Sequence, residues 1–253
     1  FGPQKFVGMQ NFQMLLRNPQ TMPALCNTII ISAWKMALHL LVPVIVSILL
    51  NEIQSNAFRR ISQTLIYLPH FLSWIILAGI LIDLLSPNGG LVNRFLGLFG
   101  AEPIFFLGSN KWFRFTLVFT DVWKEFGFGT IVYLAAITNI DPTQYEAATI
   151  DGANRFQRIM HVTVPNMRMI IVLMMVLSLG NVLNAGFDQV YNMYSEAVYS
   201  TGDILDTFIY RLSFKNGLWG QSAAVSMFKS VVSTLFISVS YLCAYKFADY
   251  RVF

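Results

Sequence analysis

Residues 146–165 read EAATIDGANRFQRIMHVTVP, a short polar segment between two long apolar stretches. The apolar stretches, at about 114–137 and 167–187, each match the roughly 20 apolar residues that cross a bilayer as a helix. The polar segment must therefore lie at a membrane surface, in a loop that we expect to span 138–166. A folded, non-spanning segment in such a place usually exists to contact something else.

The first half of this loop has the pattern of a short helix. Asp141 suits the N-cap position and Pro142 the first helical residue. The helix is expected to run through Tyr145 and to end at Asp151 and Gly152, because glycine readily takes the left-handed conformation that follows a last turn.

The second half predicts another short helix, which Asn154 can cap. Its apolar residues recur at the i, i+3, i+4, i+7 spacing of one helical stripe: Phe156, Ile159, Met160 and Thr163. Arg155 and Arg158 take the other face, and Pro165 stands where the next apolar stretch begins. Two readings fit the pattern, a helix that docks in a partner's cleft or an amphipathic loop that lies on lipid headgroups.

The composition supports a membrane protein. Of the 253 residues 55% are hydrophobic and 12% are charged, about half the usual charged share of soluble domains, which is roughly 25%. No run interleaves basic and aromatic residues, so nucleic acid is not an expected partner. Cys26 and Cys243 lack metal-ligand spacing, and we expect neither a metal site nor a disulfide.

The predicted fold class is all-α, a polytopic transmembrane helical bundle forming one domain over 1–253. Breaker-rich connectors separate five apolar stretches of spanning length, at about 25–50, 64–85, 114–137, 167–187 and 223–246. Pro43 and Pro69 are expected to kink their helices.

The orientation follows from basic residues near the span ends. Arg59, Arg60 and Arg155 are among seven on one side, and Lys5, Arg94 and Arg211 are among seven on the other. The first side has much shorter segments and so a higher charge density, which places it and the C-terminus in the cytoplasm. Five spans would leave Phe1 outside, so we expect one more helix upstream, in a native chain of six spans.

The loop resembles the EAA loop of binding-protein-dependent ABC import permeases. The matching positions are Glu146-Ala147-Ala148, Gly152, Val162, Val164 and Pro165, with valine where the family usually has Ile and Leu. The resemblance covers nearly the whole chain. FVGMQNFQMLL with Asn27-Thr28, Tyr67-Leu68-Pro69 and the ending Tyr245 to Phe253 look like the sugar-permease branch. DVWKEFGFGTIVYLAAI and GFDQVYNMY look like permeases for complex oligosaccharides of Gram-positive bacteria.

The resemblance implies a type I importer fold and a role as a transport subunit, not an enzyme. Its partners would be a second permease, two ATPase subunits, an extracellular solute-binding protein and an oligosaccharide, in the bacterial cytoplasmic membrane. Glu146 would be the polar anchor toward an ATPase, Ala147 and Ala148 the small residues at the contact, and Gly152 the turn, with Tyr145 and Arg155 beside them. No cofactor is expected on this chain, which lacks a Gly-x4-Gly-Lys-Ser/Thr sequence. ATP and Mg would bind the partner ATPases.

Polar residues inside the spans are candidates for the substrate path, because they tend to face the bundle interior or a wet cavity. The sharpest group is Asp121, Trp123, Lys124 and Glu125 in the third span, with Trp123 expected to stack on a sugar ring. Internal ion pairing is the alternative interpretation for the charges.

Three further polar residues join these candidates. Asn181 and Asn184 lie at i, i+3 on an expected helical face, and Lys229 lies in the last span. Interhelical hydrogen bonds for the asparagines, and snorkelling for Lys229, are the alternatives.

Two further pairs of intramembrane residues are expected to pack in the bundle or to line the path: Lys35 with His39, and His70 with Trp74. Four tyrosines are expected in an outer interfacial belt or against the binding protein: Tyr191, Tyr194, Tyr199 and Tyr210.

Two other functions stay open from the residues alone. One is a secondary transporter that uses Asp121, Glu125 and Lys229 for ion coupling. The other is a membrane enzyme that acts on a lipid-linked sugar, although no nucleophile–base pair is evident. For an importer, the positive net charge of +4 and the intramembrane lysines favour acidic oligosaccharides.

Overall fold

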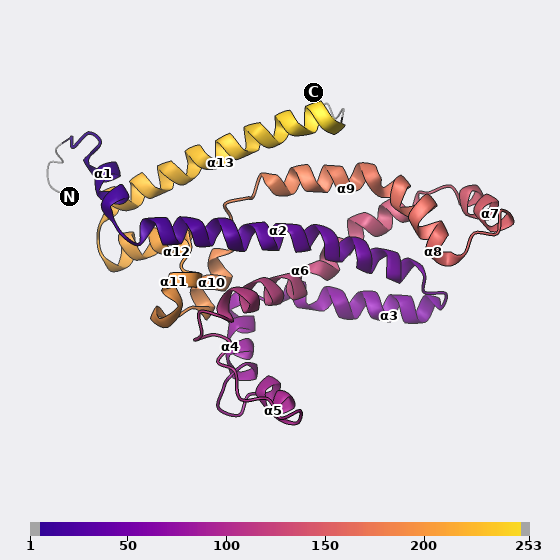
Figure 1. Cartoon of the computed structure of the whole chain (residues 1–253), viewed down its shortest axis with the longest axis horizontal. Helices are drawn as coiled ribbons and strands as arrows, with labels where there is room; N and C mark the ends of the chain where they lie inside the picture. Colours follow the sequence, from indigo (N-terminus) through magenta and orange to yellow (C-terminus); the bar gives the residue numbers. More distant parts are fainter. Residues whose placement is uncertain (1–5, 249–253) are drawn as a thin grey trace. The chain divides into compact units, whose positions relative to one another are not determined.

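The computed structural model describes residues 6–248, without the side chains of 240 and 243–248. Lys5, Arg251 and part of the resembling C-terminal end therefore lie outside the described residues, as do the side chains of Cys243 and Lys246. Residues 6–248 form helices joined by turns and contain no strand, as the predicted all-α class requires (Figure 1).

The chain divides into two compact units. Unit 1 comprises 1–34, 73–119 and 181–238, and unit 2 comprises 35–72, 120–180 and 239–253. Three long helices contribute residues to both units: α2 (Thr21–Asn51), α6 (Phe113–Thr138) and α13 (Trp219–Ala248). The predicted single domain stays a prediction.

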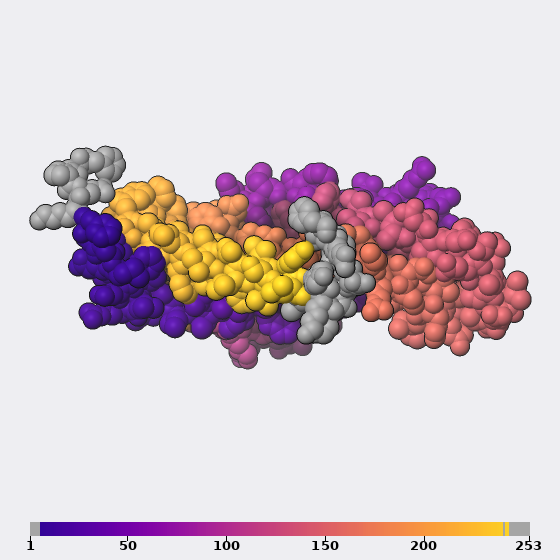
Figure 2. Space-filling model, turned by 90° about the horizontal axis from the view of Figure 1, so that it is seen from above, coloured from indigo at the N-terminus to yellow at the C-terminus, as the bar shows by residue number. Residues whose placement is uncertain are grey.

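Unit 1 combines the first part of α2 with many short helices. These are α1 (Gln10–Arg17), α4 (Trp74–Leu84), α5 (Leu91–Gly97), α10 (Phe187–Met193), the 3₁₀ turn η3 (Glu196–Val198), α11 (Tyr199–Gly202), α12 (Leu205–Tyr210) and the π-helical turn η4 (Arg211–Lys215). Its core joins Leu15 of α1, Ala24 of α2, Phe208 of α12 and Val225 of α13. Figures 1 and 2 both show α1 beside the first turns of α13.

Unit 2 holds the polar loop and the helices around it. These are α3 (Asn56–Tyr67), the 3₁₀ turn η1 (Leu68–Phe71), α7 (Pro142–Ile150), α8 (Arg155–Arg158), the π-helical turn η2 (Ile159–Thr163) and α9 (Val164–Leu179). In its core, Tyr133 and Ile137 of α6 and Ile140, just after that helix, pack with Met167 of α9. This packing fixes the two helices from which the loop projects.

Within residues 6–248, three helical segments are long and apolar enough to cross a membrane: Thr21–Asn51, Arg155–Leu179 and Trp219–Val239. A fourth would be the broken pair Asn56–Phe71 and Trp74–Leu84. Helix α6 has a spanning length of 26 residues but carries four charged side chains, two of them Asp121 and Glu125. The five-span count therefore stays a prediction.

Two of the stretches predicted as spanning helices are not continuous helices. The stretch 64–85 is not one helix, because Leu72 and Ser73 are extended and the Ser73 side chain caps α4 by accepting from the Ile76 N–H. The stretch 167–187 is not one helix either, since α9 ends at Leu179 and Gly186, with φ of 88°, precedes α10. Pro69 lies in the 3₁₀ turn at the first break, whereas Pro43 lies inside the continuous helix α2.

Candidate coupling elbow and transport path

The elbow comprises α7, α8 and the turn between them. Helix α7 begins as predicted: the Asp141 carboxylate accepts a hydrogen bond from the Thr143 N–H at 2.9 Å, and Pro142 follows in the first turn. This hydrogen bond to the backbone N–H lowers the pKa of Asp141, because it stabilises the charged carboxylate.

The turn depends on Gly152. Its φ is 78°, in the left-handed region that glycine occupies without strain. The chain returns across the end of α7 through a hydrogen bond from the Ala153 N–H to the Ala148 carbonyl, 2.9 Å long. The predicted break at Asp151 and Gly152 is confirmed.

Helix α8 begins at the predicted cap. Asn154 and Gln157 form a reciprocal capping box, with hydrogen bonds of 2.9 and 2.8 Å. The helix then passes through the π turn η2 into α9, so that Arg155–Leu179 is a continuous helical segment.

The predicted apolar stripe on this second helix is wrong in part. The π turn at Ile159–Thr163 changes the residue period, because each π hydrogen bond spans one residue more than an α-helical bond. As a result Thr163 is buried, while Phe156 is 70% exposed and Met160 is 46% exposed. The exposed apolar surface therefore comes from Phe156 and Met160 and not from the whole stripe.

Three side-chain hydrogen bonds hold α7 against the following helices. Tyr145 Oη lies 2.9 Å from Thr163 Oγ1, the Asn166 amide donates to Gln144 at 2.8 Å, and Arg158 donates to Thr149 at 3.1 Å. Tyr145, predicted as a coupling residue, thus uses its hydroxyl inside the elbow.

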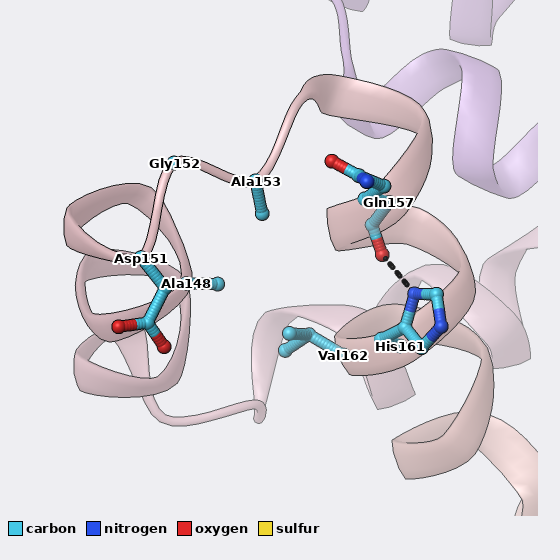
Figure 3. A pocket seen from close by; sticks show the side chains of 7 residues that line it. All are labelled: Ala148, Asp151, Gly152, Ala153, Gln157, His161 and Val162. Atoms are coloured by element: carbon cyan, nitrogen blue, oxygen red, sulfur yellow. Dashed lines mark hydrogen bonds between the residues drawn. The ribbon is translucent and has the colours of Figure 1, made fainter.

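The elbow encloses an open hollow of about 330 Å³. Figure 3 shows Ala148, Asp151 and Gly152 on the α7 side, facing Val162 and His161 across the gap. His161 and Gln157, which sequence reasoning did not select, also line the hollow, and the His161 Nδ1 lies 2.9 Å from the Gln157 carbonyl. Glu146, Ala147 and Arg155 are exposed, and Ala148 is half-buried. The predicted coupling residues are thus gathered on a small, mostly exposed surface.

The two carboxylates of α6, Asp121 and Glu125, are paired within unit 2. The Asp121 carboxylate lies 3.1 Å from Lys35 Nζ and 3.0 Å from His39 Nε2. Both partners belong to α2. Lys35 and Asp121 are buried. The internal ion pairing named as the alternative is therefore what the structure shows for Asp121.

Glu125 is paired as well. His70 Nδ1 and Lys124 Nζ each lie 2.6 Å from a Glu125 oxygen, and Lys124 also donates to the His70 carbonyl. The His70 ring stacks on Phe128 at 4.0 Å. Trp123 remains 41% exposed, so its indole is available for an external contact. Contact between these residues and a substrate stays a prediction.

The candidates in unit 1 lie differently from the sequence expectation. Asn181 and Asn184 are exposed, but they lie in the turn after α9 and not on a helical face. Their near neighbours are local, with the Asn184 N–H donating to the Asn181 carbonyl at 2.8 Å. Lys229 does not snorkel: it forms a short ion pair with Asp206 of α12, and both side chains are mostly buried.

Sequence reasoning missed a polar network in unit 1. The Asn27 amide accepts from Arg114 at 2.6 Å and donates to the Asp203 carbonyl at 3.0 Å, and Arg211 pairs with the Asp203 carboxylate at 2.6 Å. Burial alone would lower the pKa of Arg211, but its hydrogen bonds to Asp203 and the attraction of that charge outweigh burial and raise it. The only signal in the sequence was Asn27 at a span start, which does not identify partners so distant along the chain.

A family model described as "Binding-protein-dependent transport system inner membrane component" matches residues 39–252. The chain belongs to this family. The matched range contains the whole elbow and all seven candidate path residues. This permease is therefore a protein of the cytoplasmic membrane and a transport component.

The permease is 36% identical to the polygalacturonan/rhamnogalacturonan transport system permease protein YteP of Bacillus subtilis (strain 168), over 98% of its own length and 78% of the relative's. A crystal structure of a bacterial ABC transporter involved in the import of the acidic polysaccharide alginate matches with a TM-score of 0.92 and 34% identity, covering 96% of this permease and 85% of that chain. Another, of the bacterial alginate ABC transporter in complex with an alginate pentasaccharide-bound periplasmic protein, matches with a TM-score of 0.90 and 34% identity over 95% and 83%. The permease therefore has the type I ABC importer fold.

Proposed function

We propose that this permease is one of two membrane subunits of an ATP-driven importer that takes up oligosaccharides. Its partners would be a second permease, identical or homologous, two ATPase subunits and an extracellular solute-binding protein. ATP and Mg would bind the ATPase subunits. The C-terminus and the elbow would face the cytoplasm, as the density of basic residues near the span ends favours.

The elbow is the observation that carries this proposal. It is a folded, capped helical turn whose polar and small residues are mostly exposed: Glu146, Ala147, Ala148, Gly152 and Arg155. An ordinary loop on headgroups would not need two caps, a left-handed glycine and three side-chain ties to neighbouring helices. Such pre-organisation suits a surface that binds a protein partner, because little freedom is lost on docking.

The roles proposed for the elbow follow from where its residues lie. Glu146 would make the polar contact with an ATPase, and Ala147 would allow close approach there, since both are exposed on α7. Gly152 would set the angle of the turn, and Tyr145 would fasten α7 to the buried Thr163 at the start of the span. Movement of α7 would thereby be transmitted to the helix Arg155–Leu179 without an intervening break.

The substrate class is proposed from the relatives and from one exposed side chain. The similar proteins are described as transporters of polygalacturonan and rhamnogalacturonan or of alginate, which points to acidic oligosaccharides. Within the candidate path Lys124 and Lys229 each already pair with a carboxylate, so they offer little uncompensated charge. Trp123 is the path residue that we expect to contact sugar.

Uptake by vesicles separates this proposal from the two alternatives. Vesicles holding the assembled importer and the solute-binding protein should take up a tetragalacturonate probe only when ATP is supplied to the ATPase side. Glu146→Lys should abolish uptake while the complex still assembles, because it reverses the charge at the contact. Glu102→Lys, a charge reversal at an exposed glutamate of unit 1, is the control and should preserve uptake.

Uptake that a protonophore collapses and that ignores loss of the ATPase would instead establish an ion-coupled secondary transporter. Chemical change of a lipid-linked sugar by this chain without partners would establish a membrane enzyme. Either result would overturn the proposal.

A further inference from the structure

Seven aromatic rings of unit 1 form a continuous row, here called the aromatic row. It comprises Phe187, Tyr191, Tyr194, Tyr199, Tyr210, Phe214 and Trp219. Neighbouring centroids lie 4.8 to 6.2 Å apart, within the range of favourable aromatic pairs. The rings come from α10, α11, α12, η4 and α13, with Tyr194 just after α10, so the tertiary fold assembles the row and no single helix does.

The row has a fixed end and an open end. At the fixed end the Arg211 guanidinium lies 4.3 Å from the Tyr199 ring centroid and is held by its ion pair with Asp203. At the open end Phe214 is 67% exposed and Trp219 is 57% exposed. Rings that served only to fill a core would be buried there.

The backbone of the π turn Arg211–Lys215 and of Gly217 positions the rings at the open end. Tyr210 and Phe214 stand at i, i+4 and stack at 5.1 Å, with the π turn Arg211–Lys215 following Tyr210 directly. Isolated π turns occur frequently at functional sites. Gly217, with φ of 69°, then turns the chain so that Trp219 meets the edge of Phe214 at 5.2 Å.

The row also offers polar groups suited to a sugar. The Tyr191 hydroxyl donates to the Tyr210 hydroxyl at 3.3 Å, which leaves the Tyr210 proton free for an external acceptor. Lys215, in the same turn as Phe214, is exposed and adds a positive charge.

We propose that the open end of the aromatic row is a carbohydrate-binding site for acidic oligosaccharides. A pyranose ring has one face of C–H groups, which stack on an aromatic ring, and a rim of hydroxyls, which the Tyr210 hydroxyl can bind. Lys215 complements a uronate carboxylate. The site rests on the proposed function, and it uses residues other than Trp123 and the charged residues of α6.

The test uses the assembled importer, with tetragalacturonate as the acidic probe and maltotetraose as the neutral probe. Trp219→Ala and Phe214→Ala should each raise the KM for tetragalacturonate uptake about three- to tenfold, the size expected for losing one aromatic stacking contact. Vmax and ATP hydrolysis should change less than about twofold. Lys215→Ala should raise the KM for tetragalacturonate and leave maltotetraose uptake unaffected.

Trp34→Ala is the matched control, since Trp34 is an exposed tryptophan of unit 1 outside the row, at 61% exposure. It should leave the KM unchanged. If Trp219→Ala prevents assembly, Trp219→Phe and Trp219→Leu replace it: the ring-bearing variant should keep the low KM and the aliphatic one should not.

Equal effects of Trp219→Ala and Trp34→Ala would overturn the site and make the row an interfacial belt. Failure of the proposed function would look different, because the unmodified importer would then take up neither probe with ATP.

Discussion

Replacement of Gly152 tests whether the angle of the elbow matters for coupling. A Cβ at this position would meet no atom within 4 Å, so Gly152→Ala introduces no clash. The cost lies in the backbone, because a φ of 78° is left-handed and costs an ordinary L-residue about 1–2 kcal/mol. At about 1.4 kcal/mol per tenfold change, the native turn should lose about five- to thirtyfold in population relative to an opened one.

The assay is hydrogen exchange of the α7 and α8 amides in the assembled importer, read beside uptake per ATP hydrolysed. Gly152→Ala should reduce protection in α7 and α8 and should lower uptake per ATP. Gly152→Asn should have a smaller effect, because asparagine tolerates the left-handed region better than alanine. Gly152→Pro should abolish coupling, since proline fixes φ near −65°.

Gly79 provides the matched control for a glycine-to-alanine change. It lies inside α4, and a Cβ there would also meet nothing within 4 Å. Gly79→Ala should therefore leave elbow protection unchanged. If the Gly152→Ala importer had the same amide exchange and the same uptake per ATP as the unmodified importer, the left-handed turn would have no part in coupling.

Three other changes have expected outcomes of their own. Gly127→Ala should destabilise unit 2 by about 1–3 kcal/mol in thermal unfolding, because its Cβ would lie 1.9 Å from a backbone oxygen of α3, whereas Gly79→Ala should be neutral or stabilising. Lys229→Met should leave the Asp206 carboxylate mostly buried and unpaired. This should lower the free energy of unfolding by about 1–3 kcal/mol and lower the unfolding temperature. Adding Asp206→Leu should recover much of the loss, because the unpaired charge is then removed. The lowered pKa of Asp141 means that its capping carboxylate stabilises α7 above the ordinary value of 3.8 and loses this effect as pH falls through the lowered pKa. Exchange of the α7 amides should therefore rise in acid, and Asp141→Asn should remove this dependence.

The local features of the elbow could be predicted from the sequence because each depends on near neighbours. Asp141 caps the helix that starts beside it, Gly152 ends that helix, and Asn154 caps the next one. The π turn could not be predicted, because the apolar residues of 156–163 fit an ordinary helical period equally well. The two helix breaks near Ser73 and Gly180 were hidden by apolar runs whose hydrophobicity continues across them.

The pairing of the intramembrane charges could not be predicted either. The sequence shows these charges inside apolar stretches, and apart from Lys124 beside Glu125 their partners lie far along the chain. Asp121 pairs with Lys35, and Lys229 pairs with Asp206. Only the tertiary packing of helices decides which charges meet. It pairs these charges internally, and their contact with a substrate stays a prediction.

A cysteine cross-linking scan can show whether the elbow docks on an ATPase subunit. Single cysteines at 146–152 would be introduced into an importer in which Cys26 and Cys243 are replaced by serine, and cross-linking to the ATPase would be followed with and without trapped ATP. If the elbow docks there, cysteines at positions 146 and 147 should cross-link to the ATPase, with yields that change when ATP is trapped. Positions that stay accessible to water in every state, or that react with a membrane-impermeant reagent from outside the cell, would contradict this docking.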